Sequence, residues 1–82
     1  MVFRETVVDR SFTHDDSQKL VMACMRYDSE IILEAGNRKI NAKSLMGVLS
    51  LALKAGDVIT VIVKGDDQED ALNAALRALS NK

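Results

Sequence analysis

Residues Asn41–Gly56 read NAKSLMGVLSLALKAG, and this segment carries the clearest structural signals in the chain. It is expected to leave a strand, to break at Ser44 and to continue as a helix that ends at Gly56. Ser44 is a good N-cap because its hydroxyl can accept hydrogen bonds from unpaired amides two or three residues later. Lys54 is expected in the last helical turn, with Gly56 in the left-handed position after it.

The apolar side chains of this predicted helix cover more of its surface than one core contact requires. At about 100° per residue they sweep roughly 220°, whereas a stripe facing a core needs little more than 100°. The residues concerned are Leu45, Met46, Val48, Leu49, Leu51, Ala52 and Leu53. Part of this arc is therefore expected to stay in water, and an exposed apolar arc beside a capping serine is typical of a docking surface.

The rest of the chain predicts the element order βαββαβα. Alternation and β-branched runs predict strands over Val2–Val8, Ser29–Glu34, Arg38–Lys43 and Val58–Val63. The join Ala35-Gly36-Asn37 is expected to be a hairpin turn. Capping pairs, Thr13 with Asp16 and Asp66 with Glu69, predict helices after the first and the last strand. This order indicates an α+β fold with helices on one face of a largely antiparallel sheet, and the pattern alone leaves a ferredoxin-like strand order open.

Composition predicts one compact domain over residues 1–82. The net charge of −1 argues against a direct nucleic-acid partner or a membrane-surface role. The single cysteine, Cys24, cannot form an internal disulfide and is expected to be a buried, inert thiol. Because no leader and no long apolar run is present, we expect a cytoplasmic protein without membrane insertion. No motif for a cofactor or a metal ion is found, so none is expected.

The run Lys39–Leu51, KINAKSLMGVLSL, resembles the regulatory-serine segment of the histidine phosphocarrier (HPr) family, which serves the bacterial sugar phosphotransferase system. The similarity continues through Tyr27–Glu34 and Gly65–Leu72, and covers about residues 27–80. The resemblance implies an HPr-like open-faced β-sandwich, with a four-stranded antiparallel sheet covered on one face by three helices. It also implies a phosphoryl carrier or a regulatory protein rather than a catalyst.

In the HPr family a histidine before the first helix accepts a phosphoryl group from phosphoenolpyruvate by way of enzyme I. It lies in a Gly-Ile/Leu-His-Ala-Arg-Pro-like loop and passes the group to sugar-specific carriers. The corresponding stretch here is Ser11–Ser17, SFTHDDS, which lacks the arginine and the proline. Counting back without gaps from the regulatory-serine segment places Thr13 at the phosphorylated position, and His14 reaches it only with a one-residue deletion. His14 is therefore either a phosphohistidine, an exposed loop histidine, or a metal ligand together with Asp15 and Asp16.

The resemblance places Ser44 on the serine that an ATP-dependent HPr kinase phosphorylates in many Gram-positive bacteria. In that family the modified protein is a corepressor of a catabolite-control transcription factor. Leu45, Met46 and Leu49 match the family's hydrophobic docking patch beside that serine. The alternatives are an ordinary N-cap serine and ordinary core residues.

Three functions follow from these observations. The favoured one is an HPr-like regulatory protein that is switched at Ser44 and docks through Leu45, Met46 and Leu49, with HPr kinase and a catabolite-control transcription factor as partners. The second is a phosphocarrier that accepts its phosphoryl group on His14 and works with enzyme I and sugar-specific carriers. The third is an HPr-fold interaction module without phosphate chemistry.

Overall fold

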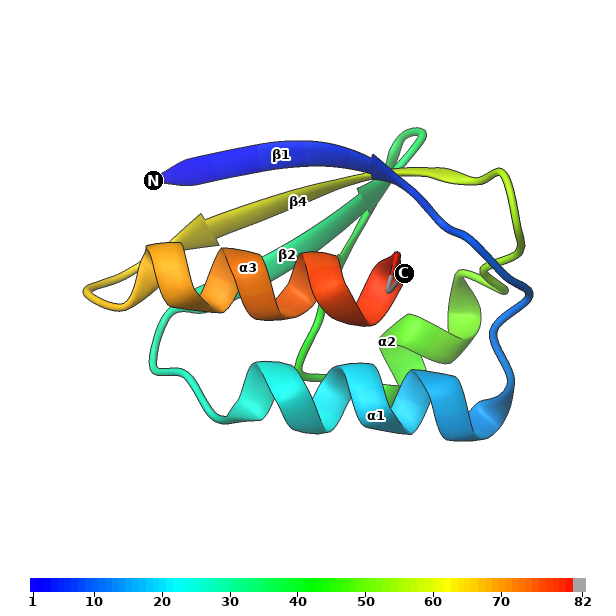
Figure 1. Cartoon of the computed structure of the whole chain (residues 1–82), viewed down its shortest axis with the longest axis horizontal. Helices are drawn as coiled ribbons and strands as arrows, with labels where there is room; N and C mark the ends of the chain where they lie inside the picture. Colours follow the sequence, from blue (N-terminus) through cyan, green and yellow to red (C-terminus); the bar gives the residue numbers. More distant parts are fainter. Residues whose placement is uncertain (81–82) are drawn as a thin grey trace.

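The computed structural model describes residues 1–80, which form one sheet and three helices. The elements are β1 (Val2–Val7), α1 (His14–Met25), β2 (Glu30–Ala35), β3 (Arg38–Asn41), α2 (Leu45–Ser50), β4 (Val58–Lys64) and α3 (Gln68–Leu79). The strands lie in the order β1-β4-β2-β3, and every neighbouring pair is antiparallel. All three helices lie on one side of this sheet (Figure 1), which confirms the predicted open-faced β-sandwich.

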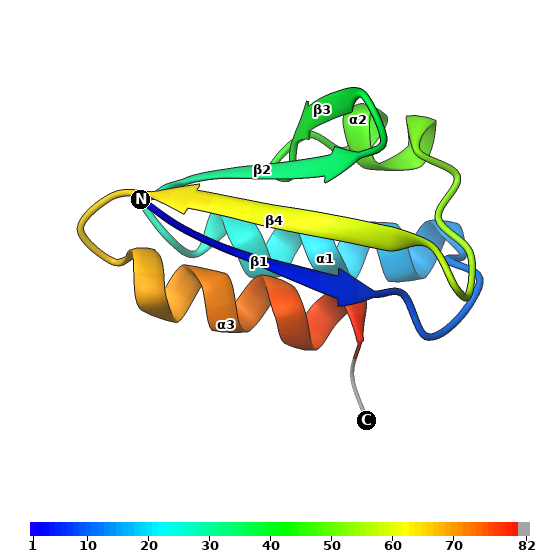
Figure 2. The ribbon, with the colours of Figure 1, turned by 90° about the horizontal axis from the view of Figure 1, so that it is seen from above.

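The strand β4 organises the sheet because it pairs with β1 on one side and with β2 on the other (Figure 2). Its alternate residues Ile59, Val61 and Val63 face the helices and are 0% exposed. Ile31 and Leu33 of β2 stand beside Val63 and Val61 in the register and are also fully buried. The alternation that predicted these strands therefore reflects one buried and one open sheet face, and each predicted strand end lies within two residues of the observed one.

The helices α1 and α3 run side by side in opposite directions beneath the sheet (Figure 1). Leu20 and Cys24 from α1 meet Leu72 and Leu79 from α3 in the same core cluster. Burial raises the pKa of the Cys24 thiol to about 11, because the charged thiolate loses its hydration. The prediction of a buried cysteine is confirmed.

The predicted end of the central helix at Gly56 is wrong, because α2 ends at Ser50. Ala52 then takes the left-handed backbone conformation, with a φ of 48°, and this turn brings Leu53 into the core. Lys54 lies beyond the helix, where its amide donates to Asp57 Oδ2 at 3.0 Å. The chain therefore leaves the helix six residues before Gly56 and continues toward β4 as a turn.

The predicted capping of the last helix by Asp66 and Glu69 is also wrong. The N-cap of α3 is Asp67, and its side chain makes no capping bond. The Asp67 carboxylate instead accepts from the Asp28 amide at 2.9 Å, from the Ser29 amide at 3.0 Å and from the Ser29 hydroxyl. It therefore joins the turn before β2 to the turn before α3, a connection that local spacing could not reveal.

The Asp67 contacts make a pH-dependent contribution to stability. The hydroxyl of Ser29 and the two amides lower the pKa of Asp67, so the folded state favours the charged carboxylate. A lowered pKa stabilises the fold above the ordinary carboxyl value of about 4, and this stabilisation is lost as the pH falls through the folded value. We expect Asp67→Asn to lower the unfolding midpoint at pH 7, and the difference from wild type to shrink below about pH 4. The measurement is urea unfolding across this range.

The control for this prediction is Asp66→Asn, which removes the same charge from an exposed neighbour. It is expected to change the midpoint much less at pH 7. A difference between Asp67→Asn and wild type that stays constant with pH would contradict the argument.

Candidate functional site

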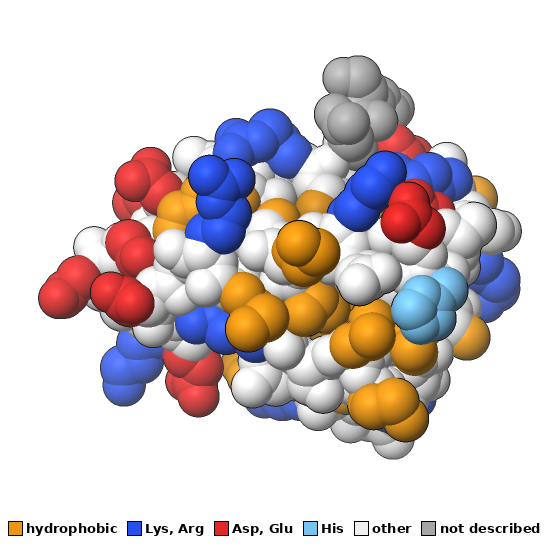
Figure 3. Space-filling model, turned by 90° about the horizontal axis from the view of Figure 1, so that it is seen from below, with side chains coloured by type: hydrophobic (Ala, Val, Ile, Leu, Met, Phe, Trp, Pro, Cys, Tyr) orange, Lys and Arg blue, Asp and Glu red, His pale blue; other side chains and the backbone are white. Residues whose placement is uncertain are grey.

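His14 lies on the surface as the first residue of α1. Figure 3 shows this single histidine in pale blue at the edge of a face on which hydrophobic side chains gather. The position immediately before it, the N-cap of α1, belongs to Thr13. Among residues 1–80, no three His, Cys, Asp or Glu side chains are arranged to hold a metal ion.

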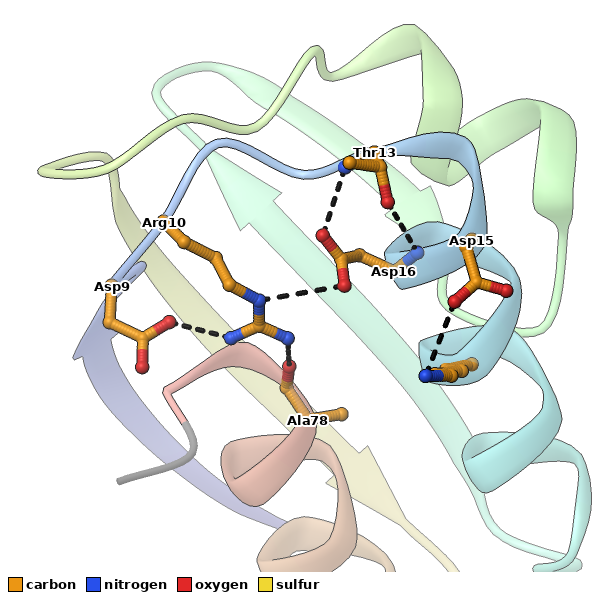
Figure 4. Close-up of polar contacts among 7 residues, drawn as sticks. Asp9, Arg10, Thr13, Asp15, Asp16 and Ala78 are labelled. Atoms are coloured by element: carbon orange, nitrogen blue, oxygen red, sulfur yellow. Dashed lines mark hydrogen bonds and ion pairs between the residues drawn. The ribbon is translucent and has the colours of Figure 1, made fainter.

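Thr13 and Asp16 form the predicted capping box (Figure 4). The Asp16 amide donates to Thr13 Oγ1 and the Thr13 amide donates to Asp16 Oδ2, each at 3.0 Å. The Thr13 backbone amide is the main cause of a lowered pKa for Asp16, so the carboxylate is charged at neutral pH. The start of α1 therefore already holds a negative group of its own.

Arg10, in the loop between β1 and α1, contacts three protein groups (Figure 4). Its Nη1 donates to Asp9 Oδ1 at 2.6 Å, and its Nε lies 3.6 Å from Asp16 Oδ1. Its Nη2 donates to the carbonyl of Ala78 in α3 at 3.3 Å. The nearest guanidinium to the start of α1 is thus used to hold the loop and the last helix together.

Sequence reasoning missed this arrangement. Arg10 and Ala78 are 68 residues apart in the chain, so no local motif joins them. The family loop places its arginine after the histidine, whereas Arg10 precedes Thr13 and its side chain is turned toward α3. The position two residues after Thr13 is Asp15, whose carboxylate lies 3.2 Å from Lys19 Nζ on the exposed side of the helix.

Ser44 is the N-cap of α2, as predicted. Its Oγ accepts from the Gly47 amide at 3.1 Å, and the side chain is half-buried. Lys43, the residue before it, does not extend toward a partner. Its Nζ donates to the carbonyl of Tyr27 at 2.6 Å and so caps the end of α1.

The predicted docking residues differ in exposure. Met46 is 76% exposed, Leu49 is half-buried, and Leu45 is half-buried with its side chain packed against the core. Helix α1, which packs against α2, adds Met22 and Met25 with exposed fractions of 61% and 63%. Sequence reasoning missed Met22 and Met25, because methionines inside an apolar helical run look like core residues.

Comparisons with known proteins agree with this geometry. The family model described as PTS HPr component phosphorylation site matches residues 14–81. The HPr-like protein Crh of Halalkalibacterium halodurans is 43% identical over 56 residues, which cover 68% of this chain and 67% of that protein. The phosphocarrier protein HPr of Treponema pallidum is 36% identical over 77 residues, covering 93% of this chain and 88% of that protein. The crystal structure of a phosphocarrier protein HPr from Bacillus anthracis is 30% identical, has a TM-score of 0.91 and covers 96% of each chain.

The resemblance noted in the regulatory-serine segment extends over nearly the whole chain in these comparisons. Both the HPr and the HPr-like Crh proteins are found among its relatives. Among residues 1–80, no helix has the length and apolar character to cross a membrane. Family model, relatives and fold agree that the chain belongs to the HPr family of the phosphotransferase system.

Proposed function

We propose that this HPr-family protein is a regulator that is switched by phosphorylation at Ser44 and docks on its partners through Leu45, Met46 and Leu49. The observation that carries the proposal is the capping box at the start of α1. It fills the N-cap with Thr13, where ungapped counting places the phosphorylated residue of the family. The phosphocarrier hypothesis would require His14, one position further on, to take over this role.

Electrostatics at the start of α1 oppose phosphoryl transfer to His14. The carboxylates of Asp15 and Asp16 follow it directly, and Arg10 is paired with Asp9 and Asp16. Like charges repel, so these two carboxylates disfavour a dianionic phosphoryl group on the neighbouring imidazole.

Ser44 has chemistry suited to modification. Its cap bond uses one lone pair of Oγ to accept from Gly47, so the hydroxyl proton stays available for a kinase base. In the transfer, Ser44 Oγ bonds to the γ-phosphorus of ATP, the bond to the bridging oxygen breaks, ADP leaves, and the proton passes to the base. The product places a charge of about −1.5 to −2 beside the exposed side chain of Met46.

Proteins named as phosphocarriers and proteins named HPr-like are both found among the relatives. Crh of Halalkalibacterium halodurans is named HPr-like, and the Treponema pallidum relative is named a phosphocarrier. For this chain we expect HPr kinase and a catabolite-control transcription factor as partners. Enzyme I and sugar-specific carriers are the partners under the phosphocarrier hypothesis.

The proposal is tested by intact-mass spectrometry after incubation with ATP and HPr kinase. We expect wild type to gain one acid-stable phosphoryl group, and Ser44→Asn to gain none. Asparagine caps a helix as well as serine does, so this variant keeps the fold while it removes the hydroxyl. Ser50→Ala is the matched control, because it removes an exposed hydroxyl from the same helix and is expected to leave phosphorylation unchanged.

A second incubation, with phosphoenolpyruvate and enzyme I, separates the hypotheses. We expect no acid-labile phosphorylation of wild type. An acid-labile phosphoryl group that disappears in His14→Ala would overturn the proposal in favour of a phosphocarrier. If neither incubation adds a phosphoryl group, the proposal fails and an interaction module without phosphate chemistry is the remaining function.

A further inference from the structure

We propose that the cleft between α1 and α3 binds small organic phosphates, at a site separate from Ser44. The cleft has a volume of about 360 Å³. Four cationic side chains line it, namely Arg10, Lys19, Arg26 and Arg77, and Asp16 is its one lining carboxylate. Clefts of roughly 300–1,000 Å³ are the size in which proteins hold small molecules.

The cleft exists because short side chains face each other where the two helices pack. Ala23 of α1 and Ala74 and Ala78 of α3 line its wall. Larger side chains at these positions would fill the space between the helices. The alanines leave an apolar surface against which the carbon skeleton of a ligand can lie, and the half-buried Tyr27 adds an aromatic surface at one side.

The charges that line the cleft are only partly neutralised. Arg10 is held by Asp9 and Asp16, and Lys19 has an ion pair with Asp15 in which both side chains are more than 70% exposed. Within residues 1–80, neither Arg26 nor Arg77 has an ion-pair partner, although the protein as a whole carries a net charge of −1.

Basic and acidic side chains are unevenly distributed over the face drawn in Figure 3. Figure 3 shows basic side chains along the upper part of this face, while acidic side chains gather mainly at its left end. A local excess of positive charge on an overall acidic protein attracts anions to this part of the surface.

Phosphate is an anion that suits arginines beside a small apolar surface. A guanidinium can donate two parallel hydrogen bonds to phosphate oxygens, which makes arginine a better phosphate ligand than lysine. Inorganic phosphate alone would leave the alanine wall and Tyr27 without contacts. The ligand we infer is therefore a phosphate ester or a nucleotide, whose organic part covers the apolar surface while its phosphate groups meet Arg26 and Arg77.

The test is an NMR titration of the ¹⁵N-labelled protein at low salt, with ADP as the organic phosphate and inorganic phosphate as the smaller anion. We expect saturable shifts for the residues that line the cleft, with tighter binding of ADP than of inorganic phosphate. Arg26→Gln combined with Arg77→Gln is expected to weaken ADP binding roughly tenfold, because charge-assisted hydrogen bonds are lost. Vesicles with and without phosphatidylglycerol test whether the source of the phosphate is a lipid headgroup.

The matched control is Lys39→Gln combined with Lys64→Gln, which removes two exposed positive charges from β3 and β4. It is expected to keep ADP affinity within about twofold, because neither lysine lines the cleft and neither donates a hydrogen bond to a ligand held there. Equal weakening by both double variants, or ADP shifts away from the cleft, would overturn the proposal. If phosphatidylglycerol vesicles bind and ADP does not, the proposal that the ligand is a free organic phosphate is wrong. The test does not depend on Ser44, because the unphosphorylated protein is used.

Discussion

Thr13→His combined with Asp15→Arg and Asp16→Pro is expected to turn the protein into a phosphoryl acceptor for phosphoenolpyruvate and enzyme I. The wild type is expected to show no acid-labile phosphorylation, so the change is from none to about one phosphoryl group per chain. The variant puts the imidazole at the N-cap of α1 and replaces the two carboxylates after it with the arginine and proline of the family loop. Proline is tolerated in the first turn of a helix, where the amide it removes has no helical partner.

The size of this effect follows from the charges. Removing the two carboxylates takes away like charges that repel the phosphoryl group, and the introduced guanidinium can donate hydrogen bonds to its oxygens. The measurement is intact-mass spectrometry before and after mild acid. The control, Asp15→Arg with Asp16→Pro alone, loses both hydrogen bonds of the capping box but keeps threonine instead of histidine at position 13, and it is expected to remain unphosphorylated. Phosphorylation of that control on His14 would show that the existing histidine already occupies the productive position.

Gly65→Ala is expected to lower the free energy of unfolding by about 3 kcal/mol, through backbone strain and overpacking together. Gly65 has a φ of 154°, and a Cβ added there would lie 2.7 Å from the Cα of Ser29 and in contact with its hydroxyl. Ser29 is buried and bonded to Asp67, so it cannot move aside without breaking that link. The change is measured by urea unfolding at pH 7.

The control for this prediction is Gly36→Ala in the turn between β2 and β3. Gly36 also has a positive φ, of 62°, but a Cβ added there would meet nothing within 4 Å. Only the left-handed backbone would then be penalised, at about 1–2 kcal/mol. Equal losses in the two variants would show that the approach to Ser29 contributes nothing.

The fold could be predicted because its signals are local. Alternation in β2 and β3 predicts two strands, the unbroken β-branched run of β4 predicts a strand inside the sheet, and Gly36 marks the turn. The end of α2 could not be predicted, because the apolar run continues past Ser50 while the chain turns at Ala52 to bury Leu53. The end of α2 is decided by the burial of Leu53 in the core, and helix propensity alone does not predict it.

In the candidate site, too, local features could be predicted from the sequence and long-range contacts could not. The capping box of Thr13 and Asp16 is a spacing pattern, so sequence reasoning found it. The bond from Arg10 to Ala78 joins two ends of the chain, and it appears only when α3 has packed against the loop. The phosphorylation of Ser44 and the docking role of Met46 stay predictions.

The buried cysteine has a practical consequence for studying this protein. Cys24 is 0% exposed and has a pKa of about 11, so roughly one thiol in ten thousand is ionised at pH 7. Thiol-directed labels react with the accessible thiolate, so the native chain offers them almost no target. One cysteine introduced on the surface, for example at the exposed Lys39 or Asn73, can then carry a single fluorophore or spin label while the natural thiol is left in place.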